Sequence, residues 1–291
     1  MTEGPNRVRG GPAPGARKRP PAPEPLPVPV ADSHCHLDIA DPPEDWLSVD
    51  DALTASAAVG VPRIVQIGCD LPGARWAAET ASRHGPVVAG VSLHPNEAPL
   101  LAAVGELDAA LAEIDRLAEL PDVRAVGETG LDHFRTGHEG RGAQEASFRA
   151  HIEMAKRHGK ALVVHDRDAH ADVLRVLAEE GPPDRVVLHC FSGDREMAQQ
   201  CVRQGWWLSF AGTVTFKNAT GLREALAVAP LDRVLVETDA PYLTPAPYRG
   251  RPNASYLVPI TVRAMADVLV TDLENLCAAI AANTDAAFGC W

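Results

Sequence analysis

Two histidines flank a cysteine in the stretch DSHCHLD, which spans residues 32–38. In an extended strand, alternate side chains point to the same side, so His34 and His36 face one point while Cys35 faces away. Two imidazoles that face one point can bind one divalent cation together. The spacing therefore predicts a metal site at this stretch, and it predicts a packing role for Cys35.

Four further residues with metal-binding side chains each follow a short apolar run later in the chain. They are Glu128, His165, His189 and Asp239. We expect Asp239 to complete one cation site with the first two histidines, and His165 and His189 to hold a second cation. Glu128 is placed to bridge the two.

Two divalent cations about 3.5–4 Å apart can activate a water and also stabilise the attacked group and its leaving oxygen. Asp239 is the expected general base, because a carboxylate beside such a water is well placed to take its proton. Glu128, as the bridge, is the second residue expected to be essential for turnover. This chemistry hydrolyses phosphodiesters, esters and amides alike.

Eight short apolar runs rich in β-branched residues must position these side chains, and we predict that each is a strand. They are residues 31–36, 63–68, 87–92, 124–128, 161–165, 185–189, 206–210 and 233–237. Helical patterns separate most of the strands, and two more follow the last one. They are residues 73–84, 107–120, 144–158, 169–180, 195–204 and 222–228, then 259–269 and 273–288.

This strand-helix alternation predicts parallel strands joined by helical crossovers. Eight such units in 291 residues predict an α/β fold of the (β/α)8 TIM-barrel type. A doubly wound open sheet is the alternative, but no GxGxxG follows the first strand. Active sites of such barrels lie at the C-terminal ends of the strands, where the six candidate ligands fall.

The first 30 residues differ in composition from the rest, with nine prolines and the basic run 17–19. Such a segment cannot bury a core, so we expect residues 1–30 to form a disordered or extended tail and residues 31–291 to form the hydrolase domain. The tail is expected either to be solvated or to act as a weak electrostatic tether to nucleic acid.

The composition limits the partners and the compartment. The net charge of −12 excludes a global basic face, so any contact with a polyanion has to be local. No apolar run approaches the roughly 20 residues of a membrane-spanning helix. The six cysteines are scattered without a CxxC pair, which predicts reduced thiols in the cytoplasm. No obligate protein partner is evident.

The motifs around the candidate ligands resemble those of the TatD family of metal-dependent hydrolases, over residues 31–289. They are DSHCHLD at 32–38, VSLHP at 91–95, GETGLD at 127–132, LVVHDRDAH at 162–170, LHCFSGD at 188–194, LSFAGTVTFKN at 208–218 and VETDAPYLTPAPYRG at 236–250. The resemblance implies an amidohydrolase-like barrel with one or two divalent cations, and deoxyribonuclease activity, usually of the 3′-to-5′ exonuclease type. It places the ligands on the same six residues.

The sequence departs from the family pattern in two places. Members often have a tyrosine pair after GLD, where this chain has His133 and Phe134. Many carry RNEPAYV where residues 251–258 are RPNASYLV. Both departures leave the ligands unchanged and affect the expected contacts to substrate.

Five residues at the strand ends are candidate substrate contacts. They are His94, Arg167, Ser192, Lys217 and Arg249. Arginine and lysine suit phosphate groups, while Ser192 with the following glycine could present backbone N–H groups at the start of the next helix. His94 is either a substrate contact or a brace for its loop.

Together these features predict a deoxyribonuclease that contains two divalent cations and acts on DNA, with single-stranded ends as the expected substrate. The alternative is a metal-dependent hydrolase of an ester or amide, such as D-aminoacyl-tRNA or a small molecule, and the acidic chain fits a small neutral substrate better. The cations are expected to be Mg²⁺, Zn²⁺ or Mn²⁺, since imidazoles favour Zn²⁺ or Mn²⁺ and Mg²⁺ prefers oxygen.

Overall fold

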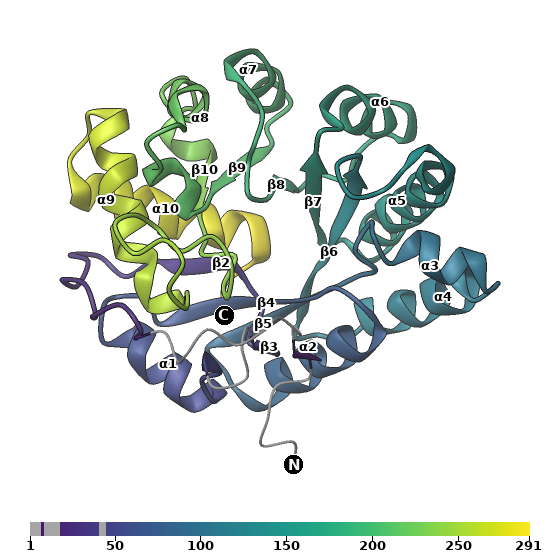
Figure 1. The fold of residues 1–291 in the computed structure, drawn as a ribbon, viewed down its shortest axis with the longest axis horizontal. Coiled ribbons are helices and arrows are strands. Elements are labelled where there is room, and N and C mark those ends of the chain that lie inside the picture. Colours follow the sequence, from purple (N-terminus) through teal and green to yellow (C-terminus); the bar gives the residue numbers. More distant parts are fainter. Residues whose placement is uncertain (1–6, 9–17, 41–44) are drawn as a thin grey trace. The chain divides into compact units, whose positions relative to one another are not determined.

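The structure is a computed structural model that describes residues 7–8, 18–40 and 45–291. Eight strands form one sheet whose order follows the chain (Figure 1). They are β2 (Ala31–Cys35), β4 (Arg63–Gly68), β5 (Val87–Val91), β6 (Val123–Asp132), β7 (Ala161–Arg167), β8 (Val186–Leu188), β9 (Trp207–Phe210) and β10 (Val234–Val236). A separate parallel pair joins β1 (Arg7–Val8) to β3 (Ile39–Ala40).

The two end strands of this order, β2 and β10, are joined just beyond their C-terminal ends. The Asp239 N–H donates to the His34 carbonyl at 2.9 Å, and the His36 N–H donates to the Ala240 carbonyl at 2.8 Å. The sheet is therefore a nearly closed barrel, and the predicted (β/α)8 fold is confirmed.

Helices follow the strands, as the alternation predicts. They are α1 (Val49–Ala57), α2 (Leu71–Arg83), α3 (Ala98–Ala103), α4 (Leu107–Ala118), α5 (His138–His158), α6 (His170–Glu180), α7 (Arg195–Arg203), α8 (Thr220–Leu226), α9 (Val258–Leu269) and α10 (Leu273–Phe288). Side-chain caps fix several helix starts: Asp70 accepts from the Gly73 N–H at α2, and Asp194 accepts from the Met197 N–H at α7. Within the described residues, no helix is long and apolar enough to cross a membrane.

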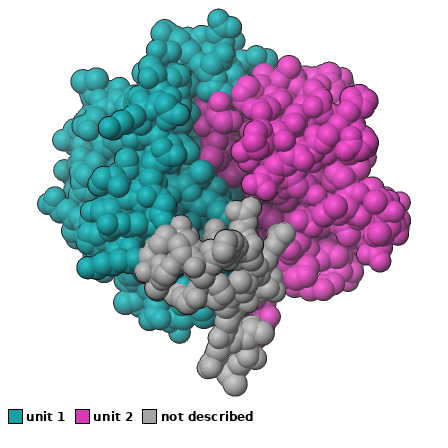
Figure 2. Space-filling model, in the orientation of Figure 1, with its two compact units in different colours: residues 1–66, 193–286 teal, residues 67–192, 287–291 magenta. Residues whose placement is uncertain are grey.

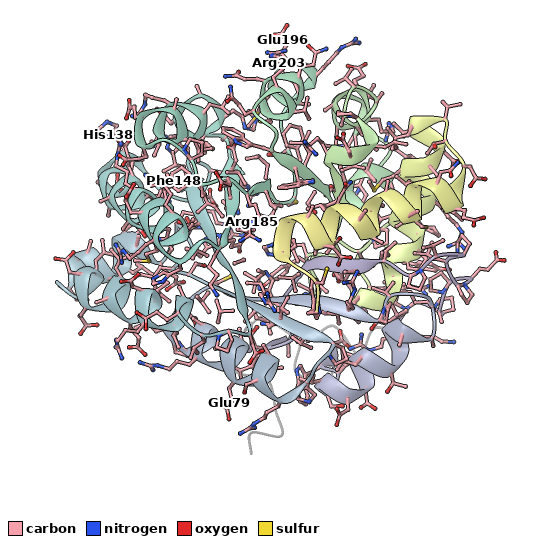
Figure 3. All side chains as sticks on the ribbon, turned by 180° about the vertical axis from the view of Figure 1, so that it is seen from behind. Glu79, His138, Phe148, Arg185, Glu196 and Arg203 are labelled. Atoms are coloured by element: carbon pink, nitrogen blue, oxygen red, sulfur yellow. The ribbon has the colours of Figure 1, made fainter. Side chains whose placement is uncertain are left out.

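The chain divides into two compact units, which Figure 2 distinguishes by colour. Unit 1 comprises residues 1–66 and 193–286, and unit 2 comprises residues 67–192 and 287–291. In unit 1, every residue of β2, β9 and β10 is buried. The outer face of helix α7 is exposed, and its side chains Glu196 and Arg203 extend away from the ribbon (Figure 3).

Unit 2 contains β5 to β8 with α2, α4, α5 and α6 packed against them (Figure 1). Phe148 and Ile152 on α5 are fully buried, and Figure 3 shows Phe148 well inside the outline while His138 lies at the outer edge. The charged outer face of α5 and α6 carries an ion-pair network in which Arg149 contacts Glu145, Glu179 and Glu180.

Several predicted boundaries are wrong. Strands β6 and β7 continue beyond the predicted ends to Asp132 and Arg167, because the two strands keep pairing there. Helix α5 begins six residues earlier than predicted, at His138 rather than at residue 144. The short helices α1 and α3 were not predicted.

The expected N-terminal tail differs from the structure at residues 18–30. Leu26 and Val30 are buried in unit 1, and their N–H groups donate to the carbonyls of Val59 at 3.1 Å and Gly60 at 3.0 Å. The Tyr256 hydroxyl also donates to the Pro20 carbonyl at 2.7 Å. Residues 1–6 and 9–17 of the expected tail lie outside the described residues.

Candidate metal centre

The first ligand group, called the β2–β10 group, consists of His34, His36 and Asp239 in unit 1. Asp239 Oδ1 lies 3.4 Å from His36 Nε2 and 3.8 Å from His34 Nε2. Both histidines are buried, and Cys35 between them packs away from the group against Ile64 and Ala240. The alternation of the strand therefore places the two imidazoles beside one carboxylate.

Main-chain hydrogen bonds hold the carboxylate of this group in place. Asp239 has a left-handed φ of 53°, and its N–H is bonded to the end of β2 as described above. The neighbouring Thr238 is fixed by the buried Asp32, whose carboxylate accepts from the Thr238 N–H at 2.9 Å and from its hydroxyl at 2.5 Å. Burial raises the pKa of Asp32 to about 6, although these hydrogen bonds act to lower it.

Asn253 braces the same loop from the segment that departs from the family pattern. Its side-chain amide donates to the Thr238 carbonyl at 2.9 Å and also to the Tyr242 carbonyl. The altered segment RPNASYLV thus still supplies an amide that supports the ligand loop.

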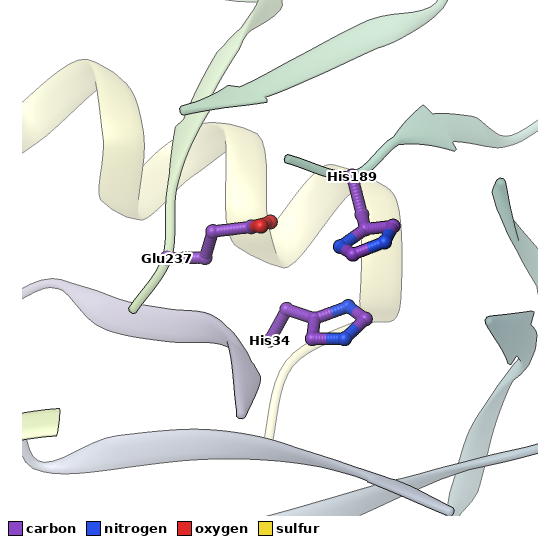
Figure 4. Close-up of side chains that lie close together, drawn as sticks. All are labelled: His34, His189 and Glu237. Carbon is purple, nitrogen blue, oxygen red and sulfur yellow. The ribbon is translucent and has the colours of Figure 1, made fainter. Parts of the chain in front are cut away.

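Sequence reasoning assigned no role to Glu237, a buried carboxylate two residues before Asp239. Glu237 and His34 offer ligand atoms within 4.8 Å of each other, and Figure 4 shows their side chains projecting to the same side of their strands. Its position directly after β10 was the signal that could have found it, because active-site residues of such barrels lie at the C-terminal ends of the strands.

The second ligand group, called the β6–β8 group, consists of Glu128, His165 and His189 in unit 2. Glu128 Oε2 lies 2.5 Å from His189 Nε2 and 3.4 Å from His165 Nδ1. The two imidazole nitrogens lie 3.3 Å apart. One carboxylate oxygen and two ring nitrogens therefore converge on a single point.

Glu128 lies inside a β-bulge rather than at a strand end. The register between β6 and β7 shifts between Val126 and Thr129, and such bulges re-aim side chains. The flanking glycines of GETG permit it: a Cβ at Gly127 would lie 2.3 Å from the Val163 carbonyl oxygen, and at Gly130 2.1 Å from that of His165. Both glycines also have positive φ, a conformation that glycine adopts readily. Only a residue without a side chain lets β7 approach this closely.

Three more side chains surround this group, and sequence reasoning gave two of them no role. The Cys69 thiol donates to Glu128 Oε1 at 3.2 Å, and Asp132 Oδ2 lies 3.5 Å from His165 Nε2. His94, predicted as a substrate contact or a loop brace, has its Nε2 3.7 Å from Glu128 Oε1. A carboxylate on the far nitrogen of a ligating histidine fixes the orientation and basicity of that imidazole, which is the role that Asp132 fits.

Electrostatics favour an ionised Glu128 beside basic imidazoles. Burial alone would raise the pKa of Glu128, but the charge of His189 and the hydrogen bonds of His165 and His189 outweigh it and hold the pKa well below its usual range. Burial alone would lower the pKa of His165, but hydrogen bonds to Asp132 and Glu128 raise it overall. The group therefore keeps a negative charge in place to attract a cation.

Most donor spacings in the two groups fit a divalent cation. Ligand atoms about 2.0–2.1 Å from a tetrahedral ion lie roughly 3.4 Å from one another. His165 Nδ1 is 3.3 Å from His189 Nε2 and 3.4 Å from Glu128 Oε2. Asp239 Oδ1 and His36 Nε2 are likewise 3.4 Å apart. Glu128 Oε2 and His189 Nε2, 2.5 Å apart, are in direct contact and would have to separate to bind the same ion. The mixture of imidazole and carboxylate suits Zn²⁺, Mn²⁺ and similar ions.

Of the remaining predicted substrate contacts, Arg167 is the last residue of β7, and Ser192, Lys217 and Arg249 lie on loops that follow strands. Ser192 is exposed and its hydroxyl donates to the Asp166 carbonyl at 3.0 Å, whereas α7 starts later, with Asp194 as its cap. Helix α7 begins at Arg195, as predicted, and Ser192 and Gly193 lie in the loop directly before its cap. Lys217 is exposed, and the guanidinium groups of Arg167 and Arg249 each lie over a phenylalanine ring.

The chain is similar to known proteins. A family model described as "TatD related DNase" matches residues 31–289. An uncharacterized metal-dependent hydrolase TatD of Mycobacterium tuberculosis is 45% identical over 262 residues, covering 89% of this chain and 97% of the relative. The uncharacterized metal-dependent hydrolase YcfH of Escherichia coli K12 is 40% identical over 246 residues, covering 84% and 90%.

The fold also matches a solved structure. The crystal structure of YJJV, a TatD homolog from Escherichia coli K12, superposes with a TM-score of 0.81 at 25% identity, covering 90% of this chain and 98% of that one. All six residues of the two ligand groups lie within residues 31–289, which the family model matches.

Proposed function

Because the chain belongs to the TatD family of metal-dependent hydrolases, we propose that it is a deoxyribonuclease that removes nucleotides from the 3′ ends of single-stranded DNA. The spacing of imidazole and carboxylate atoms in the two ligand groups carries this proposal. Two divalent cations bound there would supply an activated water and stabilise the charge of the attacked phosphodiester.

The protein's own residues have distinct tasks in this reaction. Glu128 is the proposed bridge, since its two carboxylate oxygens have different neighbours: Oε2 contacts His165 and His189, and Oε1 accepts from the Cys69 thiol. Asp239 is the proposed general base, because its Oδ1 faces the imidazoles of its group from a loop held by main-chain bonds.

His94 is a proposed hydrogen-bond donor to a phosphoryl oxygen rather than a metal ligand. The Asn96 N–H donates to His94 Nδ1 at 3.0 Å, so the neutral imidazole carries its proton on Nε2. Burial lowers the pKa of His94 to about 3, although the charge of Glu128 acts to raise it, so the ring stays neutral. Nε2 thus offers an N–H where a metal ligand would need a lone pair.

A nuclease also needs local positive charge, because the whole chain is acidic. Arg167, Lys217 and Arg249 make no side-chain ion pair within the described part of the chain, and all three lie on segments that follow ligand-bearing or neighbouring strands. Arginines on the outer helices, such as Arg175, are instead bound to carboxylates. The three unpaired cations are the proposed phosphate contacts.

A second candidate is hydrolysis of an ester or amide, such as D-aminoacyl-tRNA or a small neutral molecule. Within this candidate, the net charge of −12 favours the small neutral molecule, because an acidic surface repels a polyanion such as tRNA or DNA. The same ligand groups would serve. Substrate competition separates the two candidates, since a nuclease is inhibited by unlabelled single-stranded DNA and an amidase or esterase is not.

The deciding experiment is hydrolysis of end-labelled single-stranded DNA by metal-loaded protein. We expect nucleotides to be lost from the 3′ end, a chelator to stop the reaction, and a divalent cation to restore it. DNA that stays intact with fully metal-loaded protein would refute the proposal. We further propose that the enzyme acts in the cytoplasm, where its six free thiols would stay reduced.

A further inference from the structure

Phe134 is an exposed aromatic ring with a guanidinium group on one face. Its side chain is 63% exposed, which is costly for a phenyl ring in water. The Arg167 guanidinium lies 4.0 Å from the ring centroid, within the range of a cation–π contact. Among the large hydrophobic side chains exposed in the described residues, Phe134 is the only aromatic one.

This pair lies next to the β6–β8 group. Arg167 is the last residue of β7 and lies two residues after the ligand His165, so both side chains point to the same side of the strand. At about 3.3 Å per residue, Arg167 is roughly 6.6 Å further along the strand than His165. The His133 N–H donates to the Arg167 carbonyl at 2.9 Å, which ties the loop that carries Phe134 to the end of β7.

The guanidinium edge of Arg167 is available for an anion. Within the described residues, the Arg167 side chain has a ring contact but no hydrogen bond or ion pair. On the outer helices of the same unit, Arg75 pairs with Glu113, and Arg149 and Arg175 pair with a cluster of glutamates. A guanidinium that lies over a ring can still donate its N–H groups to an anion.

We propose that Phe134 and Arg167 form a binding site for one unpaired nucleotide of the substrate. The free part of the Phe134 ring stacks on a base, and the Arg167 edge binds an adjoining phosphate. Both groups are typical of proteins that bind single strands, because every base has a face that stacks and every nucleotide carries a phosphate. The inference rests on the proposed nuclease function and adds why the strand has to be unpaired there: a base inside a duplex has both faces covered.

Unit 1 contains a second arginine on a ring, which differs in exposure. The Arg249 guanidinium lies 4.0 Å from the centroid of Phe216, but Phe216 is half-buried. Its ring supports the arginine more than it offers a face to a base. Phe134 is therefore the ring to test, and Phe216 provides the matched comparison.

The test is binding of two short fluorescent oligomers that carry the same number of phosphates. One is thymidine DNA and the other has abasic residues, and both have phosphorothioate linkages to slow hydrolysis. We expect Phe134→Ala to weaken binding of the thymidine oligomer by about 5- to 100-fold, the range for loss of one stacked base, and to leave the abasic oligomer unaffected. Phe134→Trp should restore binding.

Arg167→Ala should weaken binding of both oligomers, and it should reduce the slope of log affinity against log salt by about 0.7, as for one phosphate contact on a single strand. Leu120→Ala is the control for loss of exposed apolar surface. It is 42% exposed and precedes β6, whereas Phe134 follows that strand. We expect no change in binding from Leu120→Ala, and only a small change from Phe216→Ala.

Phe134→Ala protein that binds both oligomers as the wild type does, or that loses both equally, would overturn the inference. Failure of the wild type to bind the thymidine oligomer would overturn it too. Hydrolysis of ordinary single-stranded DNA, measured in parallel, separates this outcome from failure of the proposed function. Normal hydrolysis with no effect of Phe134→Ala refutes only the nucleotide site, while base-dependent binding without hydrolysis refutes only the nuclease.

Discussion

The β2–β10 group and the β6–β8 group offer similar donors, yet they are built in different ways. In the first, main-chain hydrogen bonds position the ligands, and the supporting carboxylate, Asp32, contacts backbone and hydroxyl groups. In the second, side chains surround the ligands directly: Cys69 on Glu128 and Asp132 on His165. Substitution of a supporting residue should therefore alter folding in unit 1 and metal affinity in unit 2.

The largest expected effect comes from removal of either group as a whole. The double variants His34→Ala/His36→Ala and His165→Ala/His189→Ala should each lose about one metal equivalent and about a thousandfold in hydrolysis, the rate equivalent of several kcal/mol of charge stabilisation. Elemental analysis and initial rates measure both quantities. A double variant that keeps full metal content would show that its group is not a metal site.

The next effect concerns stability against pH in unit 2. His151 is buried and neutral, because its Nδ1 donates to the Ser147 carbonyl at 2.7 Å and its Nε2 accepts from the Leu93 N–H at 3.1 Å. Burial lowers its pKa to about 4 from an unfolded value of 6.5. The unfolded chain therefore binds a proton first as pH falls, and about 3 kcal/mol of stability is lost between pH 6.5 and pH 4.

Chemical denaturation of metal-free protein across this range measures the effect, with His151→Gln as the variant that should flatten the curve. The buried Asp32 in unit 1 acts with the opposite sign. Its folded pKa of about 6 exceeds the unfolded 3.8, so its contribution to stability is greatest below pH 3.8 and is lost as pH rises through 6. In the wild type, protonation of Asp32 partly offsets the loss of stability caused by His151 as pH falls. Asp32→Asn protein lacks this offset, so its stability should fall more steeply between pH 6.5 and pH 4. An unchanged curve in both variants would contradict these assignments.

A smaller effect separates the supporting carboxylates of the two groups. Asp132→Asn should weaken metal affinity or activity about 10- to 100-fold, as for other carboxylates behind a ligating histidine, with little change in melting temperature. Asp32→Asn should instead destabilise the fold by about 1–3 kcal/mol, because a buried amide N–H₂ would face N–H and hydroxyl donors. Isothermal titration with Zn²⁺ and thermal melts distinguish the two outcomes, and equal effects on both readouts would remove the distinction between the groups.

The smallest expected effect is that of Cys69→Ser. The serine hydroxyl can donate to Glu128 Oε1 as the thiol does at 3.2 Å, so hydrolysis should change by less than about threefold. Cys69→Val removes the donor and should lower activity more. If serine abolished turnover while valine preserved it, the thiol would not be acting as a hydrogen-bond donor.

The difference between the β2–β10 group and the β6–β8 group also shows which features could be predicted from the sequence. His34 and His36 were predictable because a strand alternates with period two, and the eight strands were predictable from apolar runs between helical patterns. The bulge at Glu128 was missed, although GETG places a glycine on each side of the positions that it distorts. Contacts such as Asp132 with His165 depend on the register between β6 and β7, which one sequence does not specify.

Short elements and weak periodicity account for the other differences. Helix α3 has only six residues, too few for a helical period to appear. Helix α1 has nine residues, but Ser48 caps it and was a usable signal. The burial of Leu26 and Val30 was hidden by the surrounding prolines, since composition alone does not show that an extended segment has a surface to pack against.

The most direct test of the account is to compare wild-type protein with Glu128→Ala for metal content and for hydrolysis of end-labelled single-stranded DNA. We expect the wild type to bind about two divalent cations and to release nucleotides, and the variant to lose turnover while it keeps the circular dichroism of the folded barrel. Full activity in folded Glu128→Ala protein would contradict the proposed role of the carboxylate between the imidazoles and, with it, the mechanism.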